Sequence, residues 1–173
     1  MSWIGFVIVT LLTFVLQSAV APRLELWGAR ADWLLVITVF FAMHSSGARA
    51  IAAGWLIGLL VDASTIERAG LMSMSYGICA LLVFAIRDHV LRFQWISQAI
   101  VTGLACGALR LLWFIYRRGV YGAMDGAMST FATDVLLASL ITGIWAPLFH
   151  FVLLRFAKPL GVKRPRHIYA GTR

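Results

Sequence analysis

The sequence predicts an all-α, polytopic membrane protein with six transmembrane helices, and three observations support this fold class. Hydrophobic residues make up 61% of the 173 residues, charged residues only 13%, and the mean hydropathy is +0.88. Soluble domains are about half apolar and about a quarter charged. The apolar residues also gather into six runs separated by short polar breaks. Because a bilayer-spanning helix needs roughly 20 mostly apolar residues, the chain has room for about six spans and no separate soluble domain.

The polar breaks divide the chain into its expected elements. The first span ends before Pro22, and the second begins at Asp32, which is well placed to cap its first turn. The linker 23–31 is too short to span and is expected to lie at the membrane interface. The six spans are expected at 3–21, 32–44, 49–61, 70–86, 96–116 and 127–154. The chain then divides into a six-helix transmembrane domain, 1–155, and a basic cytoplasmic tail, 156–173.

The positive charge of the chain is unevenly distributed. The net charge is +8, and six of the fifteen basic residues lie in the last nineteen positions. A basic tail beside a membrane helix is typical of a topology signal and of an anchor to anionic lipid, so we expect no nucleic-acid partner. With six spans both termini share one face, which carries nine Lys and Arg residues against five on the other. This bias predicts that both termini are cytoplasmic.

Small residues recur four positions apart on two of the predicted spans. Gly54 and Gly58 lie on one face of the third span, and Gly103 and Gly107 on one face of the fifth. Such spacing lets another helix approach closely, so each pair marks a packing face, either internal or for a helix of another protein. Asp62 follows where the third apolar run stops. Its carboxylate can reach interfacial water or cap the next segment without the full cost of burial.

Arg110 and Asp134 are the only charged residues well inside the predicted spans. Arg110 comes six residues before the end of its span and Asp134 seven residues into the next, so both lie roughly 10 Å below the same membrane face. Each alone would cost about 3 kcal/mol or more at mid-span, and pairing offsets part of that cost. We therefore predict an intramembrane ion pair, which either locks the two helices together or recognises a partner or ligand.

The sequence contains no motif that indicates a reaction centre. The patterns His-Glu-x-x-His and Gly-x-Ser-x-Gly and the Walker-type loop do not occur. Cys79 and Cys106 fall in apolar runs without metal-ligand spacing, which is typical of small buried hydrophobes. His44 and His150 are too isolated in sequence to indicate a metal site. We expect a non-enzyme with no catalytic residue, no cofactor and no metal ion.

The order and spacing of these residues resemble the family of the bacterial rod shape-determining membrane protein MreD. The resemblance covers most of the chain, and Ala31 is a departure, because the family often has Pro before the aspartate. It is carried by Gly54-Trp-Leu-Ile-Gly58-Leu-Leu-Val-Asp62, by Gly70-Leu and Tyr76, and by Gln17, Pro22, Asp32 and Pro147.

The resemblance implies a non-enzymatic scaffold or regulator of the bacterial cell-elongation complex in the inner membrane, controlling cell shape and peptidoglycan synthesis. It implies association with the bitopic protein MreC. Through MreC it implies contact with a RodA-type SEDS glycosyltransferase, a class B penicillin-binding transpeptidase and the actin-like MreB. It further implies a fold similar to the S-components, the membrane substrate-binding subunits of energy-coupling-factor transporters. Membrane lipids are further expected contacts, and self-association stays open.

Two alternatives remain at the level of sequence. A vitamin-binding subunit of an energy-coupling-factor transporter would need a polar pocket, which would lie near Arg110, Asp134 and Tyr121. A membrane enzyme or lipid flippase would need several ionisable residues facing one cavity, and the sequence offers a single such pair. For the scaffold, we expect the glycine faces to dock the single transmembrane helix of a partner.

Overall fold

The computed structural model is all-helical, as the apolar runs predict. It describes residues 2–25, 28–65, 70–90, 94–121, 128–156 and 160–161. Most of the tail 156–173 and the end of the break after Asp62 therefore lie outside the described residues. The helices are α1 (Trp3–Ala19), the short 3-10 helix η1 (Ala21–Leu24), α2 (Trp33–His44), α3 (Gly47–Ser64), α4 (Leu71–Val90), α5 (Gln94–Tyr121) and α6 (Met128–Arg155).

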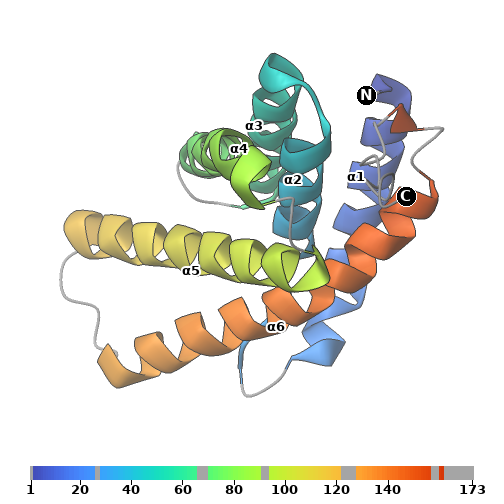
Figure 1. Ribbon diagram of the computed structural model, residues 1–173. Coiled ribbons are helices and arrows are strands. Elements are labelled where there is room, and N and C mark those ends of the chain that lie inside the picture. The colour runs from blue at the N-terminus through green and yellow to red at the C-terminus, as the bar shows by residue number, and fades with distance from the viewer. Residues whose placement is uncertain are drawn as a thin grey trace.

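Helix α2 is the centre of the fold. Every one of its 12 residues is buried, and it contacts α1, α3, α4, α5 and α6. In Figure 1 it stands between α1 on one side and α3 with α4 on the other, above α5 and α6. A helix that is apolar on all sides buries best in the middle of a bundle. The predicted cap is confirmed, because Asp32 Oδ1 accepts a hydrogen bond of 3.1 Å from the Leu35 amide.

Two antiparallel hairpins pack on this central helix. Helix α3 packs along α4, and α5 packs along α6, which crosses the lower part of Figure 1 beside it. Ser2, directly before α1, contacts Leu160, five residues after α6, because the Ser2 amide donates to the Leu160 carbonyl at 2.7 Å. The beginning of α1 and Leu160 therefore lie together.

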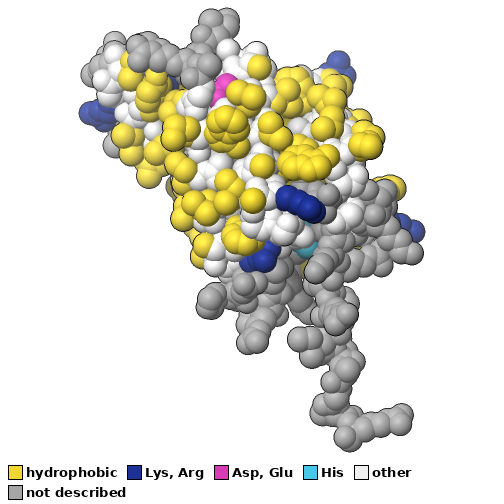
Figure 2. All heavy atoms as spheres, turned by 90° about the horizontal axis from the view of Figure 1, so that it is seen from above, with side chains coloured by type: hydrophobic (Ala, Val, Ile, Leu, Met, Phe, Trp, Pro, Cys, Tyr) yellow, Lys and Arg dark blue, Asp and Glu magenta, His cyan; other side chains and the backbone are white. Residues whose placement is uncertain are grey.

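The outer surface of the bundle carries many large apolar side chains. Figure 2 shows hydrophobic side chains spread over a whole face of the molecule, with few charged groups among them. Ile4, Leu104 and Ile144 are 75%, 70% and 73% exposed. Soluble monomers rarely expose contiguous apolar surface on this scale, whereas a lipid-facing surface needs it.

Three of the described helices are long and apolar enough to cross a membrane, and not the six that were predicted. They are Gly47–Ser64, Trp95–Val120 and Phe131–Arg155. At 1.5 Å per residue, α2 is only about 18 Å long, short of a hydrocarbon core of about 30 Å. The described apolar parts of α1 and α4 are also shorter, at Trp3–Ala19 and Leu71–Arg87. The prediction counted apolar runs, and a run buried inside the bundle looks the same in sequence as one that meets lipid.

Candidate functional site

Asp62 joins the end of α3 to the start of α4. Its Oδ2 accepts hydrogen bonds from the amides of Gly70 and Ser73 at 3.0 and 2.9 Å, and from the Ser73 hydroxyl at 2.6 Å. Its Oδ1 accepts from the Met72 amide at 3.0 Å. The Met72 and Ser73 amides belong to the first turn of α4, where backbone donors have no partner within the helix, and Gly70 stands directly before it. Of the two roles predicted for Asp62, the structure therefore shows the cap of the next segment.

The glycines of α3 face α4 of the same chain. A Cβ added at Gly58 would lie 2.5 Å from the Met72 carbonyl oxygen, and one added at Gly54 would lie 2.8 Å from the Tyr76 carbonyl oxygen. Real side chains do not approach a backbone so closely, so only glycine fits at either position. This face is occupied inside the chain and has no room for the helix of a partner.

The glycines of α5 face α6 in the same way. A Cβ at Gly103 would meet the Ser139 carbonyl oxygen at 3.1 Å, and one at Gly107 would meet Ser139 Oγ at the same distance. Across the contact, a Cβ at Gly143 would lie 2.9 Å from the Ala99 carbonyl oxygen. Both glycine faces predicted from the sequence therefore hold hairpins of this chain together. Docking of a partner helix on them, as first expected, is incompatible with this packing.

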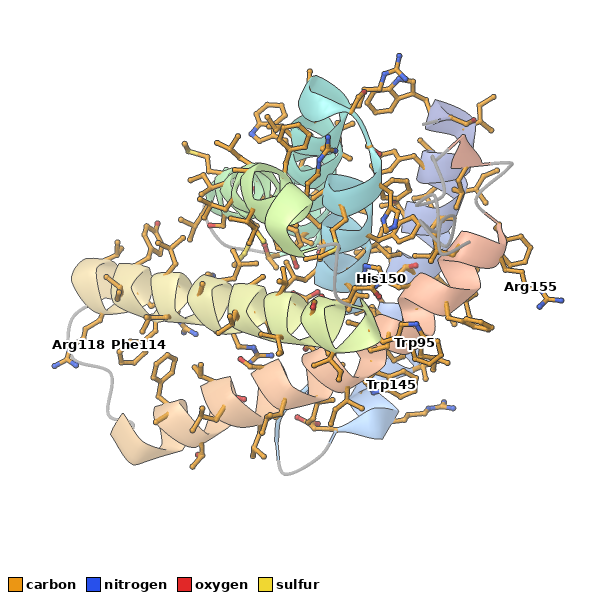
Figure 3. The ribbon with its side chains drawn as sticks, viewed as in Figure 1. Trp95, Phe114, Arg118, Trp145, His150 and Arg155 are labelled. Atoms are coloured by element: carbon orange, nitrogen blue, oxygen red, sulfur yellow. The ribbon has the colours of Figure 1, made fainter. Side chains whose placement is uncertain are left out.

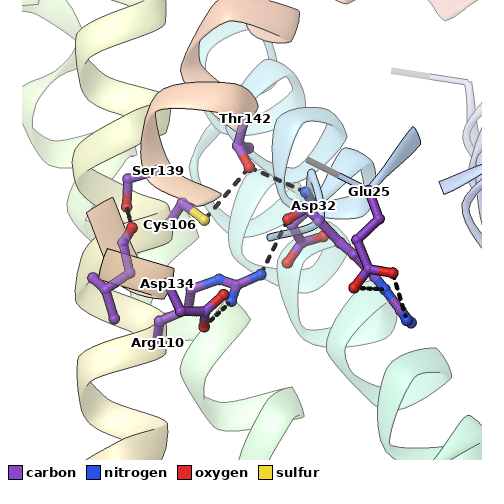
Figure 4. Close-up of polar contacts among 9 residues, drawn as sticks. Glu25, Asp32, Cys106, Arg110, Asp134, Ser139 and Thr142 are labelled. Carbon is purple, nitrogen blue, oxygen red and sulfur yellow. Dashed lines mark hydrogen bonds and ion pairs between the residues drawn. The ribbon is translucent and has the colours of Figure 1, made fainter. Parts of the chain in front are cut away.

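Arg110 and Asp134 meet between α5 and α6, as Figure 4 shows. Arg110 Nη1 lies 2.8 Å from Asp134 Oδ2, and the two side chains are 30% and 40% exposed. Arg110 Nη2 also donates to the Arg30 carbonyl oxygen at 3.1 Å, which ties the linker before α2 to the pair. The side chain of Tyr121, which the transporter alternative would place nearby, lies outside the described residues.

Asp32 is the centre of a second group of polar contacts, here called the Asp32 network: Asp32, Tyr76, Cys106 and Thr142. The Tyr76 hydroxyl donates to Asp32 Oδ2 at 2.6 Å. The Asp32 amide donates to Thr142 Oγ1 at 3.1 Å, and the Cys106 thiol lies 3.6 Å from the same oxygen. The network joins α2, α4, α5 and α6 beside the Arg110 pair (Figure 4).

Sequence reasoning identified Asp32 as a cap but missed its tertiary partners. Tyr76 and Thr142 are 44 and 110 residues away from Asp32 in the chain. Gln17 was also missed as a capping group, although its Oε1 accepts from the Leu34 amide at 2.9 Å. The available signal was a polar side chain, Gln17, in a long apolar run. This signal did not show which helix end the side chain would cap.

Some polar side chains of the bundle join two helices, and others bond only to the backbone of their own helix. Both cysteines are free and buried. Among the residues that the structure describes, no three His, Cys, Asp or Glu side chains are grouped closely enough to hold a metal ion. His44 and His150 have ring centroids 6.2 Å apart, and the Nδ1 of each lies within 2.9 Å of a backbone carbonyl oxygen on its own helix. Carbonyl oxygens only accept, so each Nδ1 carries a proton.

The fold and these contacts define a class of protein: an all-helical bundle of membrane type, in which buried polar side chains cap and join helices. No family model, no curated protein and no solved structure matches this chain.

Proposed function

We propose that the protein is a non-enzymatic, MreD-like scaffold of the cell-elongation complex in the bacterial inner membrane. In this proposal it associates with MreC, and through MreC with the SEDS glycosyltransferase, the class B transpeptidase and MreB. Ser2 and Leu160 are hydrogen-bonded, and six of the fifteen basic residues lie in the last nineteen positions, so both termini are assigned to the cytoplasmic face.

One observation carries the proposal: the residues on which the resemblance rests make contacts between helices or helix ends. Asp62 caps α4, Asp32 binds Tyr76, and Gln17 binds the first turn of α2. The α3 glycines pack against the backbone of α4. A motif made of such contacts supports a scaffold role, since its polar groups are already engaged in holding the helices of the bundle together.

Partner binding then requires surfaces other than the glycine faces. Helix α6 exposes Leu136, Leu140, Ile144 and Leu148, which are spaced by four residues and therefore form one stripe. Helix α1 exposes a second apolar face that includes Ile8 and Leu12. We assign the contact with the transmembrane helix of MreC to one of these two faces.

The proposal is tested by purifying the tagged, full-length chain from native membranes of its own bacterium and identifying the co-purifying proteins. The expected result is enrichment of MreC and of the two wall-synthesis enzymes over an unrelated tagged membrane protein. Co-purification of transporter ATPases together with a tightly held metabolite would instead support the vitamin-binding alternative and refute the scaffold.

Variants on the two exposed faces locate the contact. Leu140→Ala with Ile144→Ala changes the α6 stripe, and Ile8→Ala with Leu12→Ala changes the α1 face. We expect MreC recovery to fall for one pair and to stay at the wild-type level for the other. MreC recovery at the wild-type level with both pairs of substitutions would contradict docking on either face.

A further inference from the structure

Arg117, near the end of α5, has no acidic partner among the residues that the structure describes. Seven residues earlier on α5, Arg110 is paired with Asp134. For Arg117 the structure shows no ion pair within the described part of the chain, and its guanidinium lies over the Trp113 ring, 4.4 Å from the centroid. Both side chains are half-buried. A cation in this setting is costly unless an anion or an acceptor accompanies it.

Two N–H groups in this cluster lack an acceptor. Arg117 Nε and Trp113 Nε1 are both shielded from solvent and make no hydrogen bond to any residue that the structure describes. Buried donors are rarely left unpaired in folded proteins, so an unpaired group indicates a missing partner. Both atoms can only donate, because the indole and guanidinium groups have no acceptor. The missing partner therefore offers oxygen lone pairs, and the neighbouring charge favours an anionic one.

The cluster lies near the end of a helix that is long and apolar enough to cross a membrane. Arg117 comes four residues before the end of α5 at Tyr121, within the last turns of the apolar segment Trp95–Val120. Figure 3 shows Phe114 and Arg118 at the outer end of the α5–α6 hairpin, away from α1 and α2. Tryptophan and arginine are typical of the ends of membrane spans, at the level of the lipid headgroups.

We propose that Trp113, Arg117 and Arg118 bind the phosphate of an anionic phospholipid. The Arg117 guanidinium lifts from the Trp113 ring, which frees both N–H groups to donate to phosphate and ester oxygens, and Arg118 adds a second positive charge. Charge-assisted hydrogen bonds from arginine to phosphate are short and strong. A lipid is favoured over free phosphate because Leu112 and Ile115, 45% and 60% exposed on the same segment, can contact acyl chains.

The C-terminus of α5 makes the arginines necessary. The last carbonyl groups of a helix carry a partial negative charge, which repels an anion. The Arg117 and Arg118 guanidinium groups lie at this helix end and offset the repulsion, so loss of Arg117 should weaken binding more than loss of an arginine elsewhere on the surface.

The test is native mass spectrometry of the purified full chain, titrated with phosphatidylglycerol, with phosphatidylcholine or with inorganic phosphate. We expect the wild type to bind phosphatidylglycerol in preference to phosphatidylcholine. Arg117→Gln should lower the phosphatidylglycerol affinity about tenfold, and Trp113→Phe, which keeps a ring but removes the N–H, about threefold. Arg49→Gln, an exposed arginine in the first turn of α3, is the control for loss of one charge and should change little.

Three outcomes would overturn the proposal. Equal binding of the two lipids by the wild type would exclude an anion-selective site. An equal loss with Arg49→Gln would show that binding follows total charge. Displacement of phosphatidylglycerol by millimolar inorganic phosphate would identify a site for the free ion. Arg117→Lys is the control for misfolding, because it keeps the charge. Its phosphatidylglycerol affinity should fall between those of the wild type and Arg117→Gln.

Discussion

Removal of the Asp62 carboxylate should destabilise the α3–α4 hairpin by an amount that follows from its four hydrogen bonds. Asp62 is 5% exposed and accepts from the amides of Gly70, Met72 and Ser73 and from the Ser73 hydroxyl. Asp62→Asn keeps one acceptor oxygen but turns an NH2 group toward at least one of these donors. One buried unpaired donor costs about 1–3 kcal/mol, and loss of the negative charge at the α4 N-terminus costs a further ~0.5 kcal/mol. We therefore expect a loss of about 2 kcal/mol.

Asp62→Ala leaves all four donors without their acceptor. Water can replace the carboxylate at the half-buried Gly70 and Met72 but not at the two donors of the buried Ser73, so we expect a loss of about 4 kcal/mol. For a chain of this size each kcal/mol lowers the midpoint temperature by about 2–4 °C, so the two variants should melt roughly 6 °C and 12 °C below the wild type.

The melting point can be measured with a thiol-reactive dye in detergent, because Cys79 and Cys106 are both buried and react only when the bundle opens. Ser64→Ala is the matched control, since its hydroxyl is exposed and bonds only within its own turn. A melting point of Asp62→Ala within a degree of the control would refute the assignment of Asp62 as the cap that holds α4.

Three further predictions follow from the helix contacts. Gly58→Ala should lower the melting point because its Cβ would meet the α4 backbone at 2.5 Å, whereas Gly119→Ala, with open space around it, should leave the melting point unchanged or raise it slightly. Arg110→Asp and Asp134→Arg should each reduce the yield of folded protein in membranes. The double variant should recover only part of it, because the bond from Arg110 to the linker carbonyl is still lost; no recovery would contradict the pair. Tyr76→Phe should cost about 1–2 kcal/mol in the same dye assay, since it removes a 2.6 Å bond to a capping carboxylate, and an unchanged melting point would count against the Asp32 network.

Part of the candidate site was predictable, because the position of a charged residue along its helix indicates which residue it can pair with. Arg110 and Asp134 were paired by counting residues from the ends of two consecutive spans, and the structure brings them to 2.8 Å. Asp32 was predictable as a cap because it stands directly before an apolar run. Thr142 was not predictable, because one threonine in a long apolar helix carries no signal of the amide it will meet. The function of Arg117 was likewise hidden, since it was counted only as a topology charge.

The sequence by itself determined the class of the protein: an apolar, all-helical chain whose polar breaks mark its helix ends and whose charges are few enough to be paired by counting. Only the tertiary structure decided which apolar helix is interior. Ile37 in α2 is fully buried and Ile8 in α1 is 59% exposed, although both belong to equally apolar runs. In a soluble protein water separates the two faces of a helix into polar and apolar residues. Where lipid is the solvent, both faces are apolar, so burial, the number of spans and the occupants of the glycine faces are set by packing alone.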